Sequence, residues 1–412
     1  MTFSVREVSL GEVCEIKQGR YLAPNQMEPT PTSECLVPVI GGNGVLGYTD
    51  QSTFSFPVPL VTCRGSKCGL MQWAEPPTWI SNNAMAVYFK ENQGDNFFLH
   101  QYLLNSSFDD VTTGSAQPQI TVTNLSLKQI LLPDIQTQRK VSLIMKSVEE
   151  KILINNALSE ALEDIAQTIF KSWFIDFDPV KAKMVGEKPA GMDAATASLF
   201  PDSLVESELG FIPEGWEIRK IESLSETRLG GTPSRTRSDY WGGEIPWINS
   251  GKVNDFRITT ASEFITDLGL EKSATKLLPK GTTVLAITGS TLGQFSRLEI
   301  DACMNQSVVG LIASEDASNE FIFLSIKNGI QRLISAQTGG AQQHINKEDV
   351  NRFLIVYPGK ELMRIFTQTV ESMFFQIGVL LGQSLSLAAI RDSLLPRLIS
   401  GELQIPEEML AL

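Results

Sequence analysis

The residues in this sequence best suited to binding chemistry are basic and hydroxyl side chains on glycine-containing turns. The densest group is the run RLGGTPSRTR at residues 228–237, in a chain whose formal net charge is −13. Arginine, serine and threonine donate hydrogen bonds to phosphate oxygens, and glycine allows the backbone to approach a ligand closely. We therefore expect this turn to contact phosphates; a solvated surface turn is the alternative. Its candidate contacts are Arg228, Thr232, Ser234, Arg235 and Arg237.

Similar turns occur elsewhere in the chain. The counterpart of the 228–237 turn in the first half contains Lys17, Arg20 and Tyr21. Two further turns, in equivalent places in the two halves, follow apolar strand-like runs and suit phosphate contact. Their candidate residues are Arg64, Ser66 and Lys67 in the first half and Ser290 in the second.

Amide side chains form a second class of candidates, because glutamine and asparagine can make paired hydrogen bonds to adenine. Gln117, Gln119, Gln342 and Gln343 lie on two matching turns. These turns could equally be structural and close each domain against a following helix. Asn249 and Lys252, which follow the strand-like run IPWI, are weaker candidates for contact with a base.

The sequence predicts no catalytic, cofactor-binding or metal-binding residue. It contains no N/D-P-P-F/Y/W motif, which an amino-methyltransferase uses, and no G-x-x-x-x-G-K-[ST] nucleotide-binding loop. Residues 42–47 match G-x-G-x-x-G, but the residues that follow do not begin a helix, so a tight turn is the better interpretation. Two histidines and five widely spaced cysteines offer little for a zinc site.

Composition places the chain among soluble globular proteins, with 42% hydrophobic and 20% charged residues. The negative net charge argues against a simple polybasic nucleic-acid binder, although phosphates respond to local charge. Scattered cysteines favour a reducing, cytoplasmic compartment. We expect no membrane span: the most apolar window, residues 374–390, is interrupted by polar residues and predicts a buried helix.

An internal repeat organises the sequence. The run TGSAQPQI at 113–120 recurs as TGGAQQHI 225 residues later, and each copy is followed by an apolar run ending in proline. After each proline, residues spaced alternately by four and three predict a long helix with a coiled-coil seam. Polar Asn155 on the first seam would fix its register. Two unrelated amphipathic helices are the alternative, which the shared register disfavours.

The repeat predicts an α/β (α+β) fold with two similar mixed, strand-rich globular domains joined by two long antiparallel coiled-coil helices, related by a pseudo-two-fold repeat. Two like domains on a helical spacer about 50 Å long, at about 1.5 Å per residue, suit a target in two parts with an unread gap between them. The expected segments are 1–133 (first domain), 134–171 (first helix), 172–210 (connector), 211–358 (second domain) and 359–401 (second helix with the C-terminal segment).

Nearly the whole chain resembles the specificity (S) subunits of type I restriction–modification systems. The resemblance rests on the tandem arrangement and on several long motifs. These are the two glutamine turns, IFKSWFIDFDPVKAK after the first helix, FPDSLVESELGFIPEGWEIRKIESL at the start of the second half, and IRDSLLPRLISGEL near the end.

The resemblance implies a non-catalytic subunit whose two target recognition domains each read half of a bipartite, asymmetric double-stranded DNA sequence. It implies as partners two methyltransferase (modification) subunits and restriction/translocase subunits, for N6-adenine methylation or ATP-dependent cleavage. S-adenosylmethionine, ATP and Mg would then be bound by those partners and no cofactor by this chain. An orphan tandem-domain DNA-binding scaffold or regulator without active enzyme partners is the alternative function.

Three aromatic residues just past the first helix have two interpretations. Trp173, Phe174 and Phe177 could belong to the core, or they could dock a methyltransferase subunit, since aromatic anchors dominate protein interfaces. Both interpretations stay open at this point, and we take the three residues as partner-binding candidates.

Overall fold

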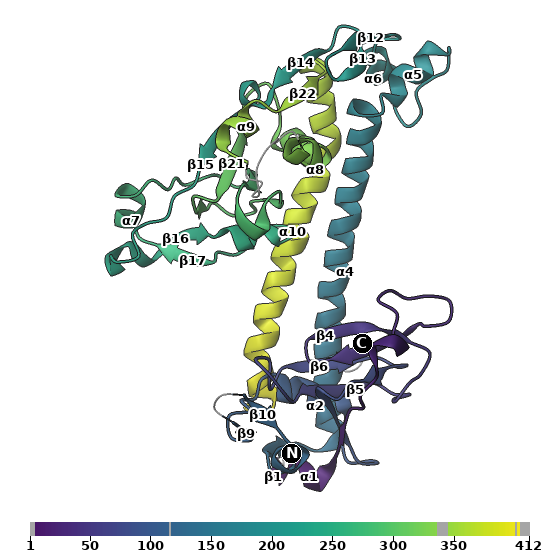
Figure 1. The fold of residues 1–412 in the computed structure, drawn as a ribbon, viewed down its shortest axis with the longest axis vertical. Helices are drawn as coiled ribbons and strands as arrows, with labels where there is room; N and C mark the ends of the chain where they lie inside the picture. The colour runs from purple at the N-terminus through teal and green to yellow at the C-terminus, as the bar shows by residue number, and fades with distance from the viewer. Residues whose placement is uncertain (1–4, 115–116, 336–344, 400–401, 404–412) are drawn as a thin grey trace. The chain divides into compact units, whose positions relative to one another are not determined.

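The computed structural model describes residues 5–114, 117–335, 345–399 and 402–403, drawn as a ribbon in Figure 1. The chain divides into two compact units: unit 1 comprises Met1–Leu153 and Leu385–Leu412, and unit 2 comprises Ile154–Ser384. The sequence placed its boundaries at the ends of the long helices. The structure divides each long helix between the units, because each domain shares a core with the helical turns nearest to it.

Unit 1 contains a four-stranded antiparallel sheet of order β2-β8-β5-β6 and a three-stranded sheet of order β4-β3-β7. Strands β5 and β8 are central and buried along their whole length, which accounts for the nearly continuous apolar runs VPLVT and AMAVYF. Its elements are β1 (Arg6–Ser9), α1 (Leu10–Val13), β2 (Cys14–Gln18), η1 (Pro24–Gln26), β3 (Val37–Gly41), β4 (Gly44–Thr49), β5 (Val58–Thr62), β6 (Met71–Ala74), β7 (Trp79–Ile80), β8 (Ala84–Phe89), α2 (Asn96–Leu104), β9 (Thr112–Thr113), β10 (Gln119–Ile120), α3 (Val122–Ser126) and β11 (Gln129–Leu132).

The globular part of unit 2 has the same arrangement, with a four-stranded sheet of order β15-β21-β18-β19 and a three-stranded sheet of order β17-β16-β20. Its elements are β14 (Glu217–Lys220), η2 (Ile221–Ser223), β15 (Ser225–Leu229), η3 (Ser238–Tyr240), β16 (Trp241–Ile248), η4 (Ser250–Asn254), β17 (Glu263–Ile265), α7 (Asp267–Glu271), β18 (Thr283–Ala286), η5 (Gly289–Thr291), β19 (Phe295–Arg297), β20 (Cys303–Met304), β21 (Val308–Ala313), α8 (Asn319–Ser335), α9 (Lys347–Asn351) and β22 (Leu354–Tyr357).

The two sheet orders correspond strand for strand, which confirms the predicted pair of similar, strand-rich mixed domains. Each domain is also closed in the same way. The strand that begins it pairs antiparallel with the strand that ends it, β1 with β11 and β14 with β22. The chain therefore enters and leaves each domain at neighbouring points.

A close backbone approach occurs at equivalent positions in the two domains. Gly19 follows β2 and its amide donates to the carbonyl of Ala84; Gly230 follows β15 and donates to the carbonyl of Val308. A methyl group at Gly19 would overlap the carbonyl oxygen of Ser81, and one at Gly230 would overlap that of Asn305. Each glycine thus permits a turn to pack directly on a neighbouring loop.

Substitution of Gly230 by alanine should destabilise unit 2, because the added methyl group meets backbone that cannot rotate away. We expect a loss of about 1–3 kcal/mol, the usual cost of overpacking. Thermal unfolding followed by calorimetry measures it. Gly382→Ala is the control: this helical residue has no atom within 4 Å of the added methyl, so its unfolding temperature should stay the same or rise. Equal unfolding temperatures for the two variants would contradict the expectation.

Two helices of 40 residues each follow the domains, α4 (Ile135–Phe174) and α10 (Lys360–Ile399). The predicted seam is observed within each unit. In unit 2, Ala166 and Phe170 of α4 share a core with Phe366 and Val370 of α10. In unit 1, the first turns of α4 pack with the last turns of α10, through Val141, Met145, Leu395 and Leu398. The helices therefore run antiparallel in both units.

Asn155 is fully buried on this seam, as its predicted role in fixing register requires. Its side-chain amide donates to the carbonyl of Leu380 at 3.4 Å and to the Gln383 side chain at 3.5 Å. Asn155 and Leu380 are 225 residues apart, the offset of the sequence repeat. The contact therefore joins equivalent positions of the two helices.

Helix α10 is long and apolar enough to cross a membrane by length and composition, with a mean hydropathy of 1.7 in its most apolar window. In unit 2 its buried side chains Phe366, Val370 and Phe374 pack in the domain core. Only 22% of the most apolar window is buried, so the helix buries one face, and the predicted buried helix is only partly buried.

The connector between α4 and the second domain is more ordered than the sequence predicted. It contains α5 (Asp178–Met184), α6 (Ala194–Ser198) and a hairpin of β12 (Leu204–Ser207) and β13 (Gly210–Pro213). The Asp193 carboxylate accepts a hydrogen bond from the Thr196 amide at 2.9 Å and so caps α6. Short capped helices such as α6 are difficult to recognise in a segment rich in alanine, glycine and proline.

Candidate nucleic-acid interface

In unit 1, four segments that are far apart in the sequence meet at one edge of the four-stranded sheet. Gln18 at the end of β2 donates to the carbonyl of Asn82 at 2.7 Å and contacts the Cys63 sulfur at 3.3 Å. Backbone hydrogen bonds then join Cys63 to Asn83 at 2.9 Å and Ile120 to Cys63 at 3.0 Å. The same edge therefore carries most of the candidate residues of the first domain.

Two of these turns lie side by side. Arg64 forms an isolated β-bridge with Gln119, and the Gly65 amide donates to the Pro118 carbonyl at 3.2 Å. Arg64, Ser66 and Lys67 are exposed on the β5–β6 loop, and Gln117 is exposed beside them. The structure thus brings the predicted phosphate-contacting and base-contacting residues of this domain together.

A groove of about 830 Å³ opens next to the Lys17–Arg20 segment, lined also by Phe54, Trp79 and Tyr88. Lys17 lies 5.2 Å from the centre of the Tyr88 ring and 3.1 Å from the Glu15 carboxylate. Hydrogen bonding with Tyr88 and Glu15 raises the pKa of Lys17, so this side chain stays charged. The aromatic rings of the groove were not singled out from the sequence, because they come from three separate segments.

Unit 2 repeats the arrangement at the equivalent edge. The Ile287 amide donates to the Ser307 carbonyl at 2.9 Å, and the Ile345 amide donates to the Ile287 carbonyl at 3.0 Å. Thr232 hydrogen-bonds with Gln306 across this edge, and Ser290 is exposed on η5. Gln342 and Gln343 lie outside the described residues.

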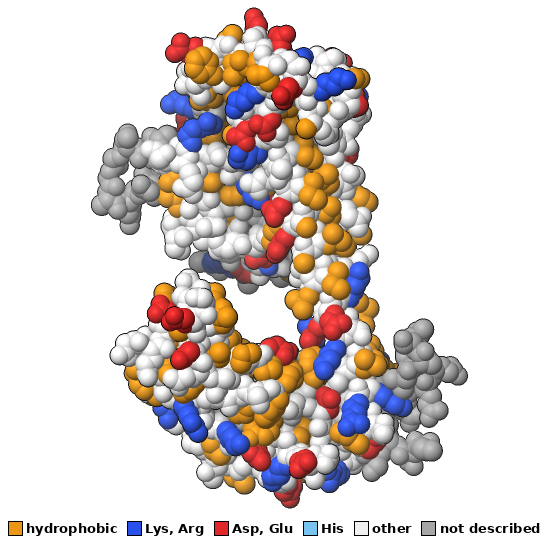
Figure 2. Space-filling model, turned by 90° about the vertical axis from the view of Figure 1, so that its right-hand side faces the viewer, with side chains coloured by type: hydrophobic (Ala, Val, Ile, Leu, Met, Phe, Trp, Pro, Cys, Tyr) orange, Lys and Arg blue, Asp and Glu red, His pale blue; other side chains and the backbone are white. Residues whose placement is uncertain are grey.

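The basic cluster predicted in the second domain is paired with carboxylates. Arg228 contacts Glu226 at 2.7 and 3.1 Å, Arg235 contacts Glu263 at 2.6 and 2.7 Å, and Arg237 contacts Asp239 at 2.9 and 2.6 Å. These exposed pairs leave little net positive charge on the turn. On the face drawn in Figure 2, Lys and Arg side chains are likewise interspersed with Asp and Glu.

Arg235 has the most defined geometry of the three arginines. Its guanidinium lies 3.7 Å from the centre of the Trp241 ring, while both of its terminal nitrogens hydrogen-bond with Glu263. The hydrogen bonds from Arg235 lower the pKa of Glu263, which therefore stays ionised near neutral pH. A DNA phosphate must displace this carboxylate to reach Arg235.

Glu263→Gln should strengthen DNA binding by a few-fold, because it removes the anion that competes with phosphate for Arg235. The pair is exposed, so the free energy of unfolding should change by less than about 1 kcal/mol. Titration of labelled DNA at two salt concentrations, with the chain in its assembled complex, measures the affinity and its salt slope. Glu208→Gln removes the same charge from the β12–β13 turn and should leave both unchanged. Weaker binding by Glu263→Gln would mean instead that the carboxylate orients Arg235.

Asn249 and Lys252 have local structural partners. The Asn249 side chain accepts a hydrogen bond from the Lys252 amide at 3.2 Å and so caps η4, while the Lys252 ammonium lies 2.8 Å from Asp255. Asn249 nevertheless remains exposed.

The three aromatic residues at and just beyond the end of α4 require a correction, since Trp173 and Phe174 form its last turn and only Phe177 follows it. Trp173, Phe174 and Phe177 are 8%, 2% and 8% exposed and belong to the core of unit 2. The Phe174 ring lies 4.9 Å from that of Phe366, and the Phe177 ring 5.7 Å from that of Trp216. The assignment to partner docking is wrong, because the connector and the second domain cover these side chains, and the core interpretation applies.

Within the described ranges, no group of three or more His, Cys, Asp or Glu side chains is placed to hold a metal ion. The candidate surfaces instead consist of polar turns and grooves, which suit binding of an extended polar ligand.

The fold and these surfaces define a class of protein with two similar domains, each presenting polar turns at one sheet edge, mounted on a pair of long helices. A family model described as the type I restriction modification DNA specificity domain matches residues 4–164 and 213–371. The chain belongs to this family, which confirms the resemblance seen in the sequence, and its role is that of a DNA specificity subunit.

Relatives agree with this assignment. The type I restriction enzyme HindI specificity subunit of Haemophilus influenzae is 29% identical over 328 residues, covering 69% of this chain and 71% of the relative. A type I restriction enzyme specificity subunit of Escherichia coli is 26% identical over 370 residues, covering 86% and 83%. The crystal structure of a type I restriction-modification system S subunit from M. genitalium has the same fold, with a TM-score of 0.62 over 98% of both chains at 14% identity.

Proposed function

We propose that this chain reads a bipartite, asymmetric sequence in double-stranded DNA, one half with each domain. The observation that carries the proposal is the combination of identical sheet order with different side chains at equivalent turns. Arg20 follows Gly19 in the first domain, for example, where Gly231 follows Gly230 in the second. Like folds with unlike contact residues would read two half-sites of different sequence.

The proposed DNA contacts are the exposed and half-buried polar residues on the turns at these two edges and beside the groove. Arginine and lysine would hold phosphates, while glutamine and asparagine would face base edges. The described candidates are Lys17, Arg20, Tyr21, Arg64, Ser66, Lys67, Gln117, Gln119, Arg228, Thr232, Ser234, Arg235, Arg237, Asn249, Lys252 and Ser290.

We infer that the chain itself is non-catalytic and acts with two methyltransferase subunits and with restriction subunits. Those partners would bind S-adenosylmethionine for N6-adenine methylation, and ATP and Mg for cleavage. The relatives are named as specificity subunits of restriction enzymes, which supports the assignment of catalysis and cofactor binding to other subunits. A cytoplasmic location fits DNA as the substrate and the five cysteines, none of which forms a disulfide.

The long helices offer a surface for these partners. In unit 2, Ile154, Leu158 and Ile165 of α4 are exposed at spacings of four and seven residues, which places them on one helix face. Figure 2 shows hydrophobic side chains exposed along the helix surface. An exposed apolar stripe of this kind suits helices of a partner subunit.

Leu158→Lys should weaken assembly with the methyltransferase subunit by about tenfold or more, because a charge enters an apolar contact. Titration of labelled chain with the purified partner measures the dissociation constant. Glu160→Gln, an exposed substitution on the same helix that also raises the net charge by one, is the control and should assemble normally. Normal assembly by Leu158→Lys would exclude this face as the docking surface.

The function is tested by sequencing N6-methyladenine in the host with and without the gene. We expect one bipartite motif with two unlike halves to lose its methylation on deletion. A single continuous motif, or two identical halves, would contradict the proposal. An unchanged methylation pattern in a host that makes the methyltransferase subunit would contradict it as well.

A further inference from the structure

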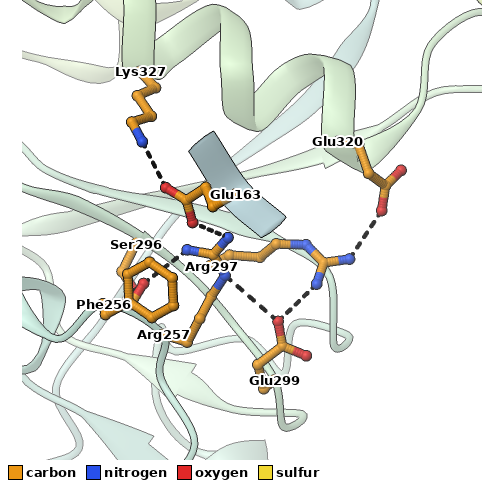
Figure 3. A network of polar contacts seen from close by, with 8 residues as sticks. All are labelled: Glu163, Phe256, Arg257, Ser296, Arg297, Glu299, Glu320 and Lys327. Carbon is orange, nitrogen blue, oxygen red and sulfur yellow. Dashed lines mark hydrogen bonds and ion pairs between the residues drawn. The ribbon is translucent and has the colours of Figure 1, made fainter. Parts of the chain in front are cut away.

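A network of buried charges joins the second domain to the helices within unit 2 (Figure 3). It contains three carboxylates and three cations, drawn from α4, from β19, from α8 and from the loops that hold Arg257 and Glu299. The exposed ammonium of Lys280 also lies 3.3 Å from the Glu299 carboxylate. The side chains of Arg257, Glu299 and Glu163 are only 1%, 5% and 6% exposed. The members are Glu163, Arg257, Arg297, Glu299, Glu320 and Lys327.

Glu163 is the member on helix α4, and both of its carboxylate oxygens point to the second domain. One accepts a hydrogen bond from the Lys327 ammonium of α8 at 2.7 Å, and the other pairs with the Arg257 guanidinium. Arg257 also donates to the carbonyl of Phe256 at 2.9 Å. Glu163 thus joins α4 to two separate parts of the domain.

The rest of the network extends the connection to helix α10. Arg297 donates to Glu299 at 2.7 Å and to Glu320 at 3.0 Å. The Arg297 guanidinium lies 5.3 Å from the centre of the Phe374 ring on α10. A Cβ at Gly378 of the same helix would lie 3.0 Å from a Glu299 carboxylate oxygen, so this glycine leaves room for the buried ion pair.

Such a network constrains orientation more strongly than an apolar contact does. The hydrophobic effect is not directional, whereas a displaced buried charge loses its partner in a medium of low dielectric constant. The buried charges all keep their partners only when the domain sits in one position on the helices.

The first domain is attached differently. Its helix α2 meets α4 through hydrogen bonds from Ser142 to Asp95 at 2.6 Å and from Gln101 to Glu149 at 2.7 Å. Among the described residues of unit 1, no arginine with a fully buried side chain takes part in these contacts. The charge network is therefore a feature of the second domain.

We propose that Glu163 is a positioning residue that holds the second domain in a single orientation on its helices and thereby fixes the gap length of the DNA target. This rests on the proposed function, since only a two-part reader has a gap. One added base pair moves a half-site by about 3.4 Å and rotates it by about 35°. A domain held at Glu163 cannot follow that displacement; a released domain can.

The test uses the assembled methyltransferase complex and DNA substrates that contain both half-sites with the native gap or with one base pair more or fewer. The main variant is Glu163→Leu with Arg257→Met, which removes one charge of each sign and so leaves the net charge of the network unchanged. Glu163→Gln is the milder variant. Glu160→Gln, an exposed position one turn away on α4, is the matched control.

We expect both Glu163 variants to raise methylation of the altered-gap substrates, relative to the native gap, by about tenfold. The half-site sequences should stay the same, and Glu160→Gln should behave as wild type. An unchanged ratio in a variant that still methylates the native gap would overturn the proposal. An equal fall at all three gaps would also overturn it, because that is the signature of a purely structural role.

The same experiment distinguishes failure of the proposed function from failure of the proposal about Glu163. If the wild-type complex methylates no bipartite motif, the two-part reader is excluded before any variant is compared. If the double variant does not fold, Glu163→Gln alone decides the question. The unfolding temperature of each variant shows which case applies.

Discussion

Exchange of residues Glu217–Tyr357 for the matching domain of another family member should replace one half of the methylated sequence and leave the other half unchanged. The structural reason is that β14 and β22 pair antiparallel, with Glu217 opposite Tyr357. The chain therefore enters and leaves this domain at adjacent positions. Under the proposed function, the half-site read by the first domain would depend on turns held inside unit 1. Sequencing of N6-methyladenine in a host carrying the exchanged gene measures both halves at once.

The reverse exchange is the control. Replacing the first domain between β1 and β11, at Arg6 and Leu132, should change only the other half-site. A donor domain without equivalents of Arg257 and Lys327 leaves Glu163 buried and unpaired, so its exchange should be combined with Glu163→Leu. A change in both half-sites after either exchange would contradict independent reading by the two domains.

Phe366→Ala should destabilise unit 2 far more than truncation of an exposed side chain on the same helix. The Phe366 ring is fully buried on α10 and lies 4.9 Å from Phe174, 5.9 Å from Phe170 and 6.0 Å from Trp173. Its removal leaves a cavity where helix, connector and domain share one core. We expect a cost of about 3–5 kcal/mol.

Thermal unfolding measures this cost, and Phe375→Ala is its matched control on the same helix. Phe375 is 71% exposed, so its truncation should change stability by less than about 0.5 kcal/mol. Similar unfolding temperatures for the two variants would show that the aromatic cluster does not stabilise unit 2.

The sequence predicts the elements that depend on local pattern. The helical period before and after Asn155, and the apolar runs that form β5 and β8, are local signals, and the repeat shows that the strands occur twice. The glutamine turn is a recurring feature of the sequence, and the structure adds that Ile120 and Ile345 hydrogen-bond to equivalent strand ends.

The sequence does not predict which charged residues that are distant in the chain form ion pairs with each other. Glu163 and Arg257 are far apart in the chain, and neither residue type predicts burial by itself. The same holds for Arg235 and Glu263, whose pairing turns an apparent basic cluster into a nearly neutral one. The aromatic residues Trp173, Phe174 and Phe177 at the end of α4 were ambiguous, because their burial depends on the connector that folds over them.

The way the polar turns are attached bears on how this chain can evolve. Cys63, Ile120, Ile287 and Ile345 fix the turns through main-chain hydrogen bonds, which do not depend on the side chains exposed at the tips. Substitutions at Arg64, Ser66, Lys67 or Ser290 therefore leave the scaffold intact. Under the proposed function, single mutations at these positions would tune the contacts with phosphates without disturbing the fold, whereas changes at the buried charges would disturb the fold itself.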